Sequence, residues 1–128
     1  MFDALGYIAE ERELAPLRMA APQERARLWE EFWRRRDPTP GTERNEVKEE
    51  FLARIRHAQE EFTGTRPGWK TDRGRIYIVH GAPGTIERFP YRAEGPATEI
   101  WTYEQEGLRF VFVDRHGLGE FVLWREGY

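Results

Sequence analysis

The sequence predicts an α+β protein in which N-terminal helices pack on a roughly four-stranded antiparallel meander sheet. Apolar residues recur at helical spacing between residues 22 and 62. From residue 75 onward, short runs of alternating apolar and polar residues are typical of strands. Because the helical patterns precede the strand patterns and do not alternate with them, a doubly wound parallel sheet is excluded.

A chain of 128 residues has the length of one domain. We expect an N-terminal arm or short helix over residues 1–21, followed by a single α+β domain over residues 22–128. Pro16 interrupts the apolar pattern of the arm, so a short helix should end before it and a packed turn should follow.

Two longer helices are expected next. The first begins at Pro22, which suits a first helical turn, and ends before Asp37-Pro38. The second begins at Glu43 with Thr42 as its N-cap and closes at Gly64. Apolar side chains form a broad aromatic face on the first helix and one stripe on the second: Leu28, Trp29, Phe32 and Trp33, then Val47, Phe51, Ile55, Ala58 and Phe62.

The strands begin at RIYIVHG, residues 75–81, where Ile76, Ile78 and His80 alternate with Tyr77 and Val79. A short irregular strand is expected over residues 85–89, and a long loop follows it. Three clearer strands are expected over residues 98–105, 108–114 and 119–126, separated by turns at Glu106-Gly107 and Arg115-His116-Gly117. Strands joined by such short turns form an antiparallel meander.

The composition excludes several kinds of chemistry. The chain has no cysteine and no serine, so disulfides, thiolate zinc sites, thiol nucleophiles and serine nucleophiles are absent. His57, His80 and His116 lack the spacing of a metal site, and Gly81-Ala82-Pro83-Gly84 lacks the lysine of a phosphate-binding loop. We therefore predict no metal and no cofactor.

The charge balance argues against two classes of partner. The 20 basic and 23 acidic residues leave a formal charge of −3, which gives no long-range attraction for nucleic acid or an anionic membrane. No apolar segment is long enough to span a bilayer, and the N-terminus lacks the pattern of a signal peptide. We expect a soluble domain, and export of a larger parent protein to the cell envelope is compatible with this sequence.

One group of charged residues is a candidate site. Asp72, Arg73, Arg75 and His80 flank the expected first strand, while Asp37, Asn45 and Glu46 lie on the loop and helix start before it. If that helix start folds back against Trp69, acids and arginines would meet in a cleft that could bind or protonate a small ligand. The competing interpretation, which we favour, is an ion-pair network that locks the loop between helix and sheet.

Several motifs resemble, in the same order, the bacterial GWxTD domain. They are FWRRRDPTPGTERNE, then GWKTDRGRIYIVHGAP, and finally EIWTY, LRFVFVD and GLGEF, and together they cover about residues 28–124. The resemblance implies that Gly68, Trp69, Thr71 and Asp72 form the signature. It also implies roles for these further residues: Arg73, Gly74, Ile76, Tyr77, Phe32, Trp33, Asp37, Pro38, Pro40, Asn45 and Glu46. Ala82 departs from the Gly-Pro-Pro that family members often have after this segment.

The resemblance implies no established catalytic activity, and family members are often parts of larger exported bacterial proteins. Our leading hypothesis is a non-enzymatic protein-interaction or assembly module that holds a protein partner, a neighbouring domain or a second copy. It predicts that Trp101 or Trp124 is exposed in an apolar patch. The alternative is a small-molecule or glycan-binding domain, extending to a hydrolase. This alternative needs Asp37, Glu46, Asp72 and His80 around a cleft, with two carboxylates roughly 5 to 10 Å apart.

Overall fold

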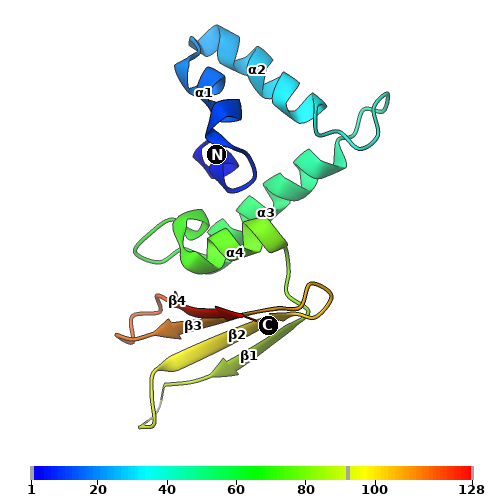
Figure 1. The fold of residues 1–128 in the computed structure, drawn as a ribbon. Helices are drawn as coiled ribbons and strands as arrows, with labels where there is room; N and C mark the ends of the chain where they lie inside the picture. Colours follow the sequence, from blue (N-terminus) through cyan, green and yellow to red (C-terminus); the bar gives the residue numbers. More distant parts are fainter. Residues whose placement is uncertain (1, 92, 128) are drawn as a thin grey trace. The chain divides into compact units, whose positions relative to one another are not determined.

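The computed structural model describes residues 2–91 and 93–127 and confirms the predicted α+β fold (Figure 1). Helices come first and an antiparallel sheet follows. The helical elements are the 3₁₀-helix η1 (Phe2–Tyr7), α1 (Glu11–Met19), α2 (Pro22–Arg34), α3 (Glu46–Phe62), the 3₁₀-helix η2 (Gly68–Lys70) and α4 (Asp72–His80). The strands are β1 (Thr85–Phe89), β2 (Ala97–Tyr103), β3 (Leu108–Asp114) and β4 (Val122–Gly127).

The chain divides into two compact units, Met1–Arg56 and His57–Tyr128. The division falls inside α3, so the first turns of this helix belong to one unit and its last turns to the other. The boundary expected between residues 21 and 22 therefore lies within the first unit. None of the helices in the part of the chain that the structure describes has both the length and the apolar character needed to cross a membrane.

The first unit has its own apolar core. Trp33 is buried against the rings of Phe32 and Phe51, whose centroids lie 4.9 and 5.3 Å from its own. An ion pair between Glu13 and Arg36, with Arg36 Nη2 2.8 Å from Glu13 Oε1, joins α1 to the segment after α2. These contacts bury the aromatic face that the sequence predicts for α2.

Two expectations for the first unit are wrong. Helix α1 continues through Pro16, because it places Leu14 and Leu17 in the core on either side of the proline. Helix α3 begins at Glu46 and not at Glu43, since Asn45 is the cap: its Oδ1 accepts a hydrogen bond from Lys48 N at 3.1 Å. Thr42 instead donates to carbonyl oxygens within the loop.

The segment predicted as the first strand is also wrong, because residues 72–80 form helix α4. Thr71 caps this helix, with its Oγ1 accepting from Gly74 N at 3.0 Å. Gly81 ends it in a conformation with φ of 82°, which favours glycine. In the helix, Ile76 and Ile78 are both buried, although residues two positions apart lie on different sides of a helix.

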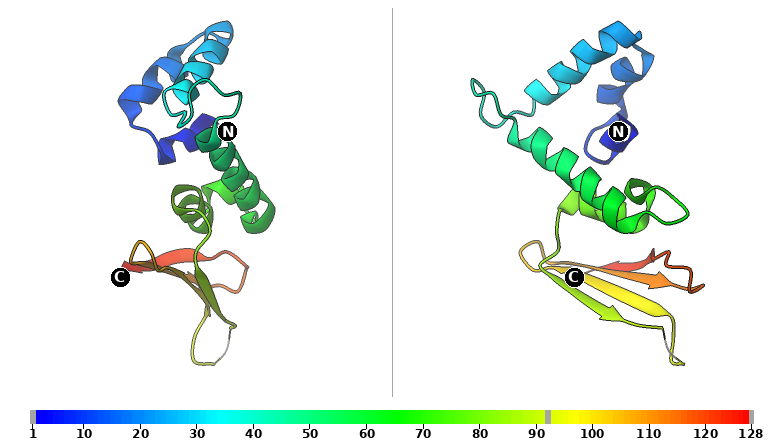
Figure 2. Two further views of the ribbon diagram at one scale, coloured as in Figure 1. Left: turned by 90° about the vertical axis from the view of Figure 1, so that its right-hand side faces the viewer. Right: turned by 180° about the vertical axis from the view of Figure 1, so that it is seen from behind.

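The sheet of the second unit is a meander in the order β1-β2-β3-β4 with every pair antiparallel. The three C-terminal strands are confirmed, and so is the short strand expected at residues 85–89, which is β1 and forms the first strand of the sheet in place of residues 75–81. The C-terminal part of α3 and helix α4 lie on one face of the sheet, which we call the inner face (Figures 1 and 2). The core is here, and its buried residues are Ile76, Trp101, Tyr103, Phe110 and Phe112.

Candidate functional site

Two glycines of the signature segment lie where backbones touch. A Cβ on Gly68 would lie 1.9 Å from the carbonyl oxygen of Ala58 in α3, and a Cβ on Gly74 would lie 1.9 Å from the carbonyl oxygen of Gly68. Both distances are far below van der Waals contact. The segment can therefore pack between α3 and α4 only with glycine at these two positions.

Hydrogen bonds from the residues between these glycines connect the same three helical segments, α3, η2 and α4. The amide of Trp69 donates to Gln59 Oε1 in α3 at 3.0 Å, and the amide of Gly68 donates to Thr63 Oγ1 at 2.8 Å. Thr71 donates from its hydroxyl to Gly68 O at 2.7 Å while it accepts from the amide of Gly74. The polar groups of the signature are thus engaged in fixing α3, η2 and α4 to one another.

Asp72 connects the start of helix α4 to the sheet. Its Oδ2 accepts a hydrogen bond from the backbone amide of Leu123 in β4 at 2.7 Å. Strand β4 is an edge of the sheet, and its other side pairs with β3. Asp72 therefore covers a backbone donor that an edge strand would otherwise expose to another chain. Its Oδ1 lies 4.0 Å from Arg75 Nη2, a weak and partly exposed pair.

Arg73 belongs to a buried ionic cluster on the inner face. Its guanidinium lies 4.8 Å from the ring centre of Phe62 and 4.5 Å from that of Phe121. Glu99 is buried and accepts two hydrogen bonds. Its Oε2 accepts from Arg73 Nη1 at 3.4 Å, and its Oε1 accepts from Trp101 Nε1 at 2.7 Å. Burial lowers the pKa of Arg73, and the neighbouring Glu99 opposes that shift. The carboxylate of Glu99 offsets the charge of Arg73, as expected of a structural ion pair between the helices and the sheet.

His80 ends α4 with its Nδ1 3.0 Å from Glu106 Oε2, so its partner is a carboxylate. Arg75 and His80 both line a shallow cavity of about 390 Å³ whose apolar wall includes Ile76, Leu108 and Phe110. No carboxylate of the predicted set is among its lining residues. Two other predicted site residues, Thr71 and Arg73, line a separate and much smaller cavity of about 20 Å³.

The other predicted residues stabilise the loop before α3. Thr39 joins Asp37 and Glu46, because its amide donates to Asp37 Oδ1 at 2.9 Å and its hydroxyl donates to Glu46 Oε2 at 2.9 Å. Asn45 donates from Nδ2 to the carbonyl oxygen of Trp33 at 2.6 Å, which ties the α3 cap to the end of α2. Among the described residues, no three or more His, Asp and Glu side chains are grouped so that they could hold a metal ion.

The opposite face of the sheet, which we call the outer face, carries apolar side chains that no described helix of the second unit covers. Its exposed members are Phe89, Val122 and Trp124, and the side chain of Trp124 is 56% exposed whereas Trp101 on the inner face is 1% exposed. The register places these residues on the outer face with them: Thr98, Ile100, Thr102, Val111 and Val113.

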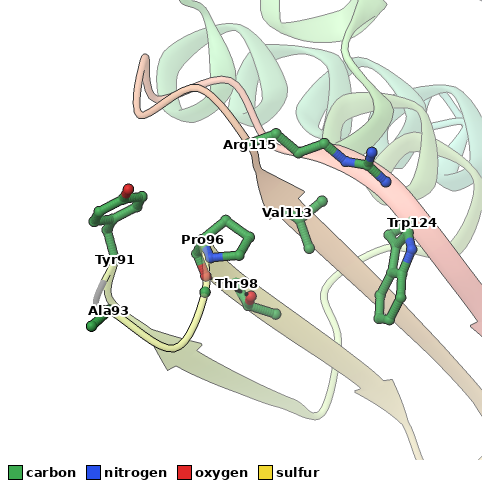
Figure 3. Close-up of a pocket in the computed structure, with 8 residues that line it drawn as sticks. Tyr91, Ala93, Pro96, Thr98, Val113, Arg115 and Trp124 are labelled. Carbon is green, nitrogen blue, oxygen red and sulfur yellow. Dashed lines mark hydrogen bonds between the residues drawn. The ribbon is translucent and has the colours of Figure 1, made fainter.

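A groove of about 580 Å³ crosses this face (Figure 3). Thr98 and Val113 line its centre, Trp124 stands on one side, and Tyr91 from the loop between β1 and β2 stands on the other. Arg115, just after β3, lies at one end. We call this the outer groove. Of these residues, Trp124 alone is a candidate from the sequence. The unbroken apolar run Phe110–Val113 is a further signal of this surface, because it predicts that both faces of the strand are apolar.

Comparisons with known proteins agree with the motifs. Searches of the curated proteins and of the solved structures gave no significant match. The family model of the GWxTD domain matches residues 1–126, and within that range lies the Gly68–Asp72 segment whose packing is described above. The chain therefore belongs to the GWxTD domain family.

Proposed function

We propose that this chain is a non-enzymatic protein-interaction module, and that it binds a partner protein or a neighbouring domain through the outer face of its sheet. The observation that carries the proposal is the exposure of Trp124 beside the outer groove. Tryptophan is among the residue types that contribute most to binding when a partner covers them. Phe89 and Val122 extend the apolar surface on either side.

The signature segment supports this division of roles. Gly68, Thr71 and Asp72 are engaged in packing and in hydrogen bonds that hold the helices against the inner face. The C-terminal part of α3 and helix α4 cover the inner face, whereas no described helix of the second unit covers the outer face, and we therefore assign the outer face to the partner. We propose accordingly that the signature positions the sheet and does not itself contact a partner.

The binding or hydrolysis of a glycan has less support. Asp37, Glu46 and Asp72 each accept hydrogen bonds from neighbouring loop or strand groups, and His80 is paired with Glu106. A general acid and base need free access to a substrate proton. Of the four, His80 lines the cavity described above, and none of the three carboxylates is among the residues that line it.

Photocrosslinking tests the proposed surface. A photoreactive phenylalanine derivative replaces Trp124 in one variant and Met19, which is 86% exposed in α1, in another. Each variant is irradiated in cells that make the protein naturally, and adducts are identified by mass spectrometry. We expect a defined protein adduct from position 124 and none from position 19. An adduct between two copies of the chain would identify the partner as a second copy.

The purified partner then gives the quantitative test. Trp124→Ala should weaken its affinity by about thirtyfold, the size of a hot-spot contribution, while Met19→Ala should leave it unchanged. Titration calorimetry measures both. Equal affinity of the wild type and Trp124→Ala would reject the outer face as the binding surface.

A further inference from the structure

Resting on the proposed function, we infer that the segment bound in the outer groove is an acidic peptide, with a large apolar side chain flanked by aspartate or glutamate. The inference comes from the way arginines are distributed in the second unit. Arginines near the inner face or its loops have carboxylate partners within 4.0 Å: Arg66 with Glu120, Arg73 and Arg88 with Glu99, and Arg75 with Asp72.

Three other arginines of this unit, Arg109, Arg115 and Arg125, differ from these. They are exposed, and no ion pair joins any of them to another described residue. Arg109 pairs with Thr102 and Arg125 with Val111 in the register, so both lie on the outer face, and Arg115 lines the outer groove. Among the described residues of the second unit, these three arginines without an ion-pair partner thus lie on the outer face or beside the outer groove.

Their positions indicate how a peptide would lie. Arg125 lies 5.2 Å from the ring centre of Trp124, and Arg115 lines the same groove. Two acidic residues lie on the other side of this surface: Glu87 on β1, and Glu94 in the loop that precedes β2. An apolar side chain between Trp124 and Tyr91 would therefore place neighbouring carboxylates favourably over β3 and β4. The forked guanidinium group binds a carboxylate through two hydrogen bonds.

Single-stranded RNA is the other polymer that aromatic and arginine side chains on a sheet can bind. Such binding depends on a positive field that gathers phosphates, whereas this chain has a net charge of −3. Three arginines offset by Glu87 and Glu94 match a few carboxylates better than a polyphosphate backbone. The observations therefore favour the acidic peptide, and RNA becomes an outcome of the test.

The test is a selection from a phage-displayed random dodecapeptide library on the immobilised whole chain, with Trp124→Ala used for counter-selection. We expect the selected peptides to be enriched in aspartate and glutamate next to a large apolar residue. Enrichment of basic or uncharged peptides would overturn the inference, and so would the failure to select any peptide that depends on Trp124. The proposed function is judged separately, by crosslinking from position 124.

Fluorescence anisotropy with one selected peptide provides the second measurement. Replacing its acids by asparagine and glutamine should weaken binding at least about tenfold, and the double variant Arg115→Gln, Arg125→Gln should lose the same factor. The double variant Arg12→Gln, Arg27→Gln removes equal charge from exposed helix positions and should bind normally. Unchanged binding to Arg115→Gln, Arg125→Gln, or tighter Trp124-dependent binding of labelled oligouridylate, would contradict the inference.

Discussion

At Gly68 the lack of a side chain is a packing requirement, because the carbonyl oxygen of Ala58 occupies the place of a Cβ. Neither group can move away easily: Ala58 is inside α3, and the amide of Gly68 is held by Thr63. The same holds for Gly74, whose neighbour is the backbone of Gly68 itself. The two glycines therefore bring three helical segments together at one point.

Gly68→Ala should lower the free energy of unfolding by about 3 kcal/mol, since overpacking against backbone forces a displacement. Gly64→Ala is the matched control, because no atom lies within 4 Å of its Cβ position and its φ is not positive. We expect that variant to change stability by less than about 0.5 kcal/mol. Urea denaturation measures both, and equal stability of the two variants would contradict the packing argument.

Asp72 offers a second test at single-residue scale. Asp72→Ala leaves the Leu123 amide without its acceptor, which should cost about 1 to 3 kcal/mol and speed hydrogen exchange at that amide. Asp72→Asn keeps an acceptor oxygen and should recover most of the protection. If instead exchange at Leu123 is equally fast in both variants, the hydrogen bond is not what protects the edge of β4.

Helix α4 forms where the local sequence pattern predicts a strand. The segment RIYIVHG is rich in β-branched and aromatic residues and alternates as a strand does. Its helical conformation is decided by Thr71, which caps the first turn, and by the fit of Gly74 against η2. Thr71-Asp72 is a capping signal in the sequence itself. The contact between Gly74 and the backbone of Gly68 involves a second element, η2, and a local pattern does not predict it.

The link between α1 and the end of α2 predicts a dependence of stability on pH. The hydrogen bond from Arg36 lowers the pKa of Glu13 below its ordinary value of 4.5. The ionised pair therefore stabilises the folded state fully above pH 4.5, and this stabilisation is lost as the pH falls below 4.5 through the lowered pKa.

Glu13→Gln should remove part of the loss of stability in acid, so that its curve of unfolding free energy against pH is flatter than that of the wild type below pH 4.5. Glu10→Gln is the control, because the pair between Glu10 and Arg12 is well exposed and contributes little. Chemical denaturation at a series of pH values gives both curves. Parallel curves for the wild type and Glu13→Gln would reject the role of this pair.

For the whole molecule, local periodicity is enough to predict that helices precede strands and that the C-terminal strands form a meander, although it does not predict helix α4. The candidate binding surface was harder to predict. Trp101 and Trp124 both lie in strand patterns, yet one is buried in the core and the other is exposed. The difference depends on the face of the sheet that each residue occupies, because helices cover only the inner face, where Trp101 lies. Which face the helices cover is a non-local property, so both tryptophans are candidates from the sequence alone.

The division of the chain into two compact units gives the last prediction. Leu17 is buried in the first unit and Phe112 in the second. Phe112→Ala should weaken its own unit by about 3 to 5 kcal/mol, and Leu17→Ala its own by about 2 to 5 kcal/mol, because each leaves a cavity. Hydrogen exchange should accelerate in β2 and β3 for the first variant and in α1 and α2 for the second. The exposed position Leu118 supplies a control, since Leu118→Ala opens no cavity.

Helix α3 is the informative element, because the division falls within it. Amides in its first turns should accelerate with Leu17→Ala, and amides in its last turns, next to Phe62, should accelerate with Phe112→Ala. Such a split would mean that each core stabilises its own part of one continuous helix. Uniform acceleration along α3 and across both units, with either variant, would show instead that the chain unfolds as one cooperative body.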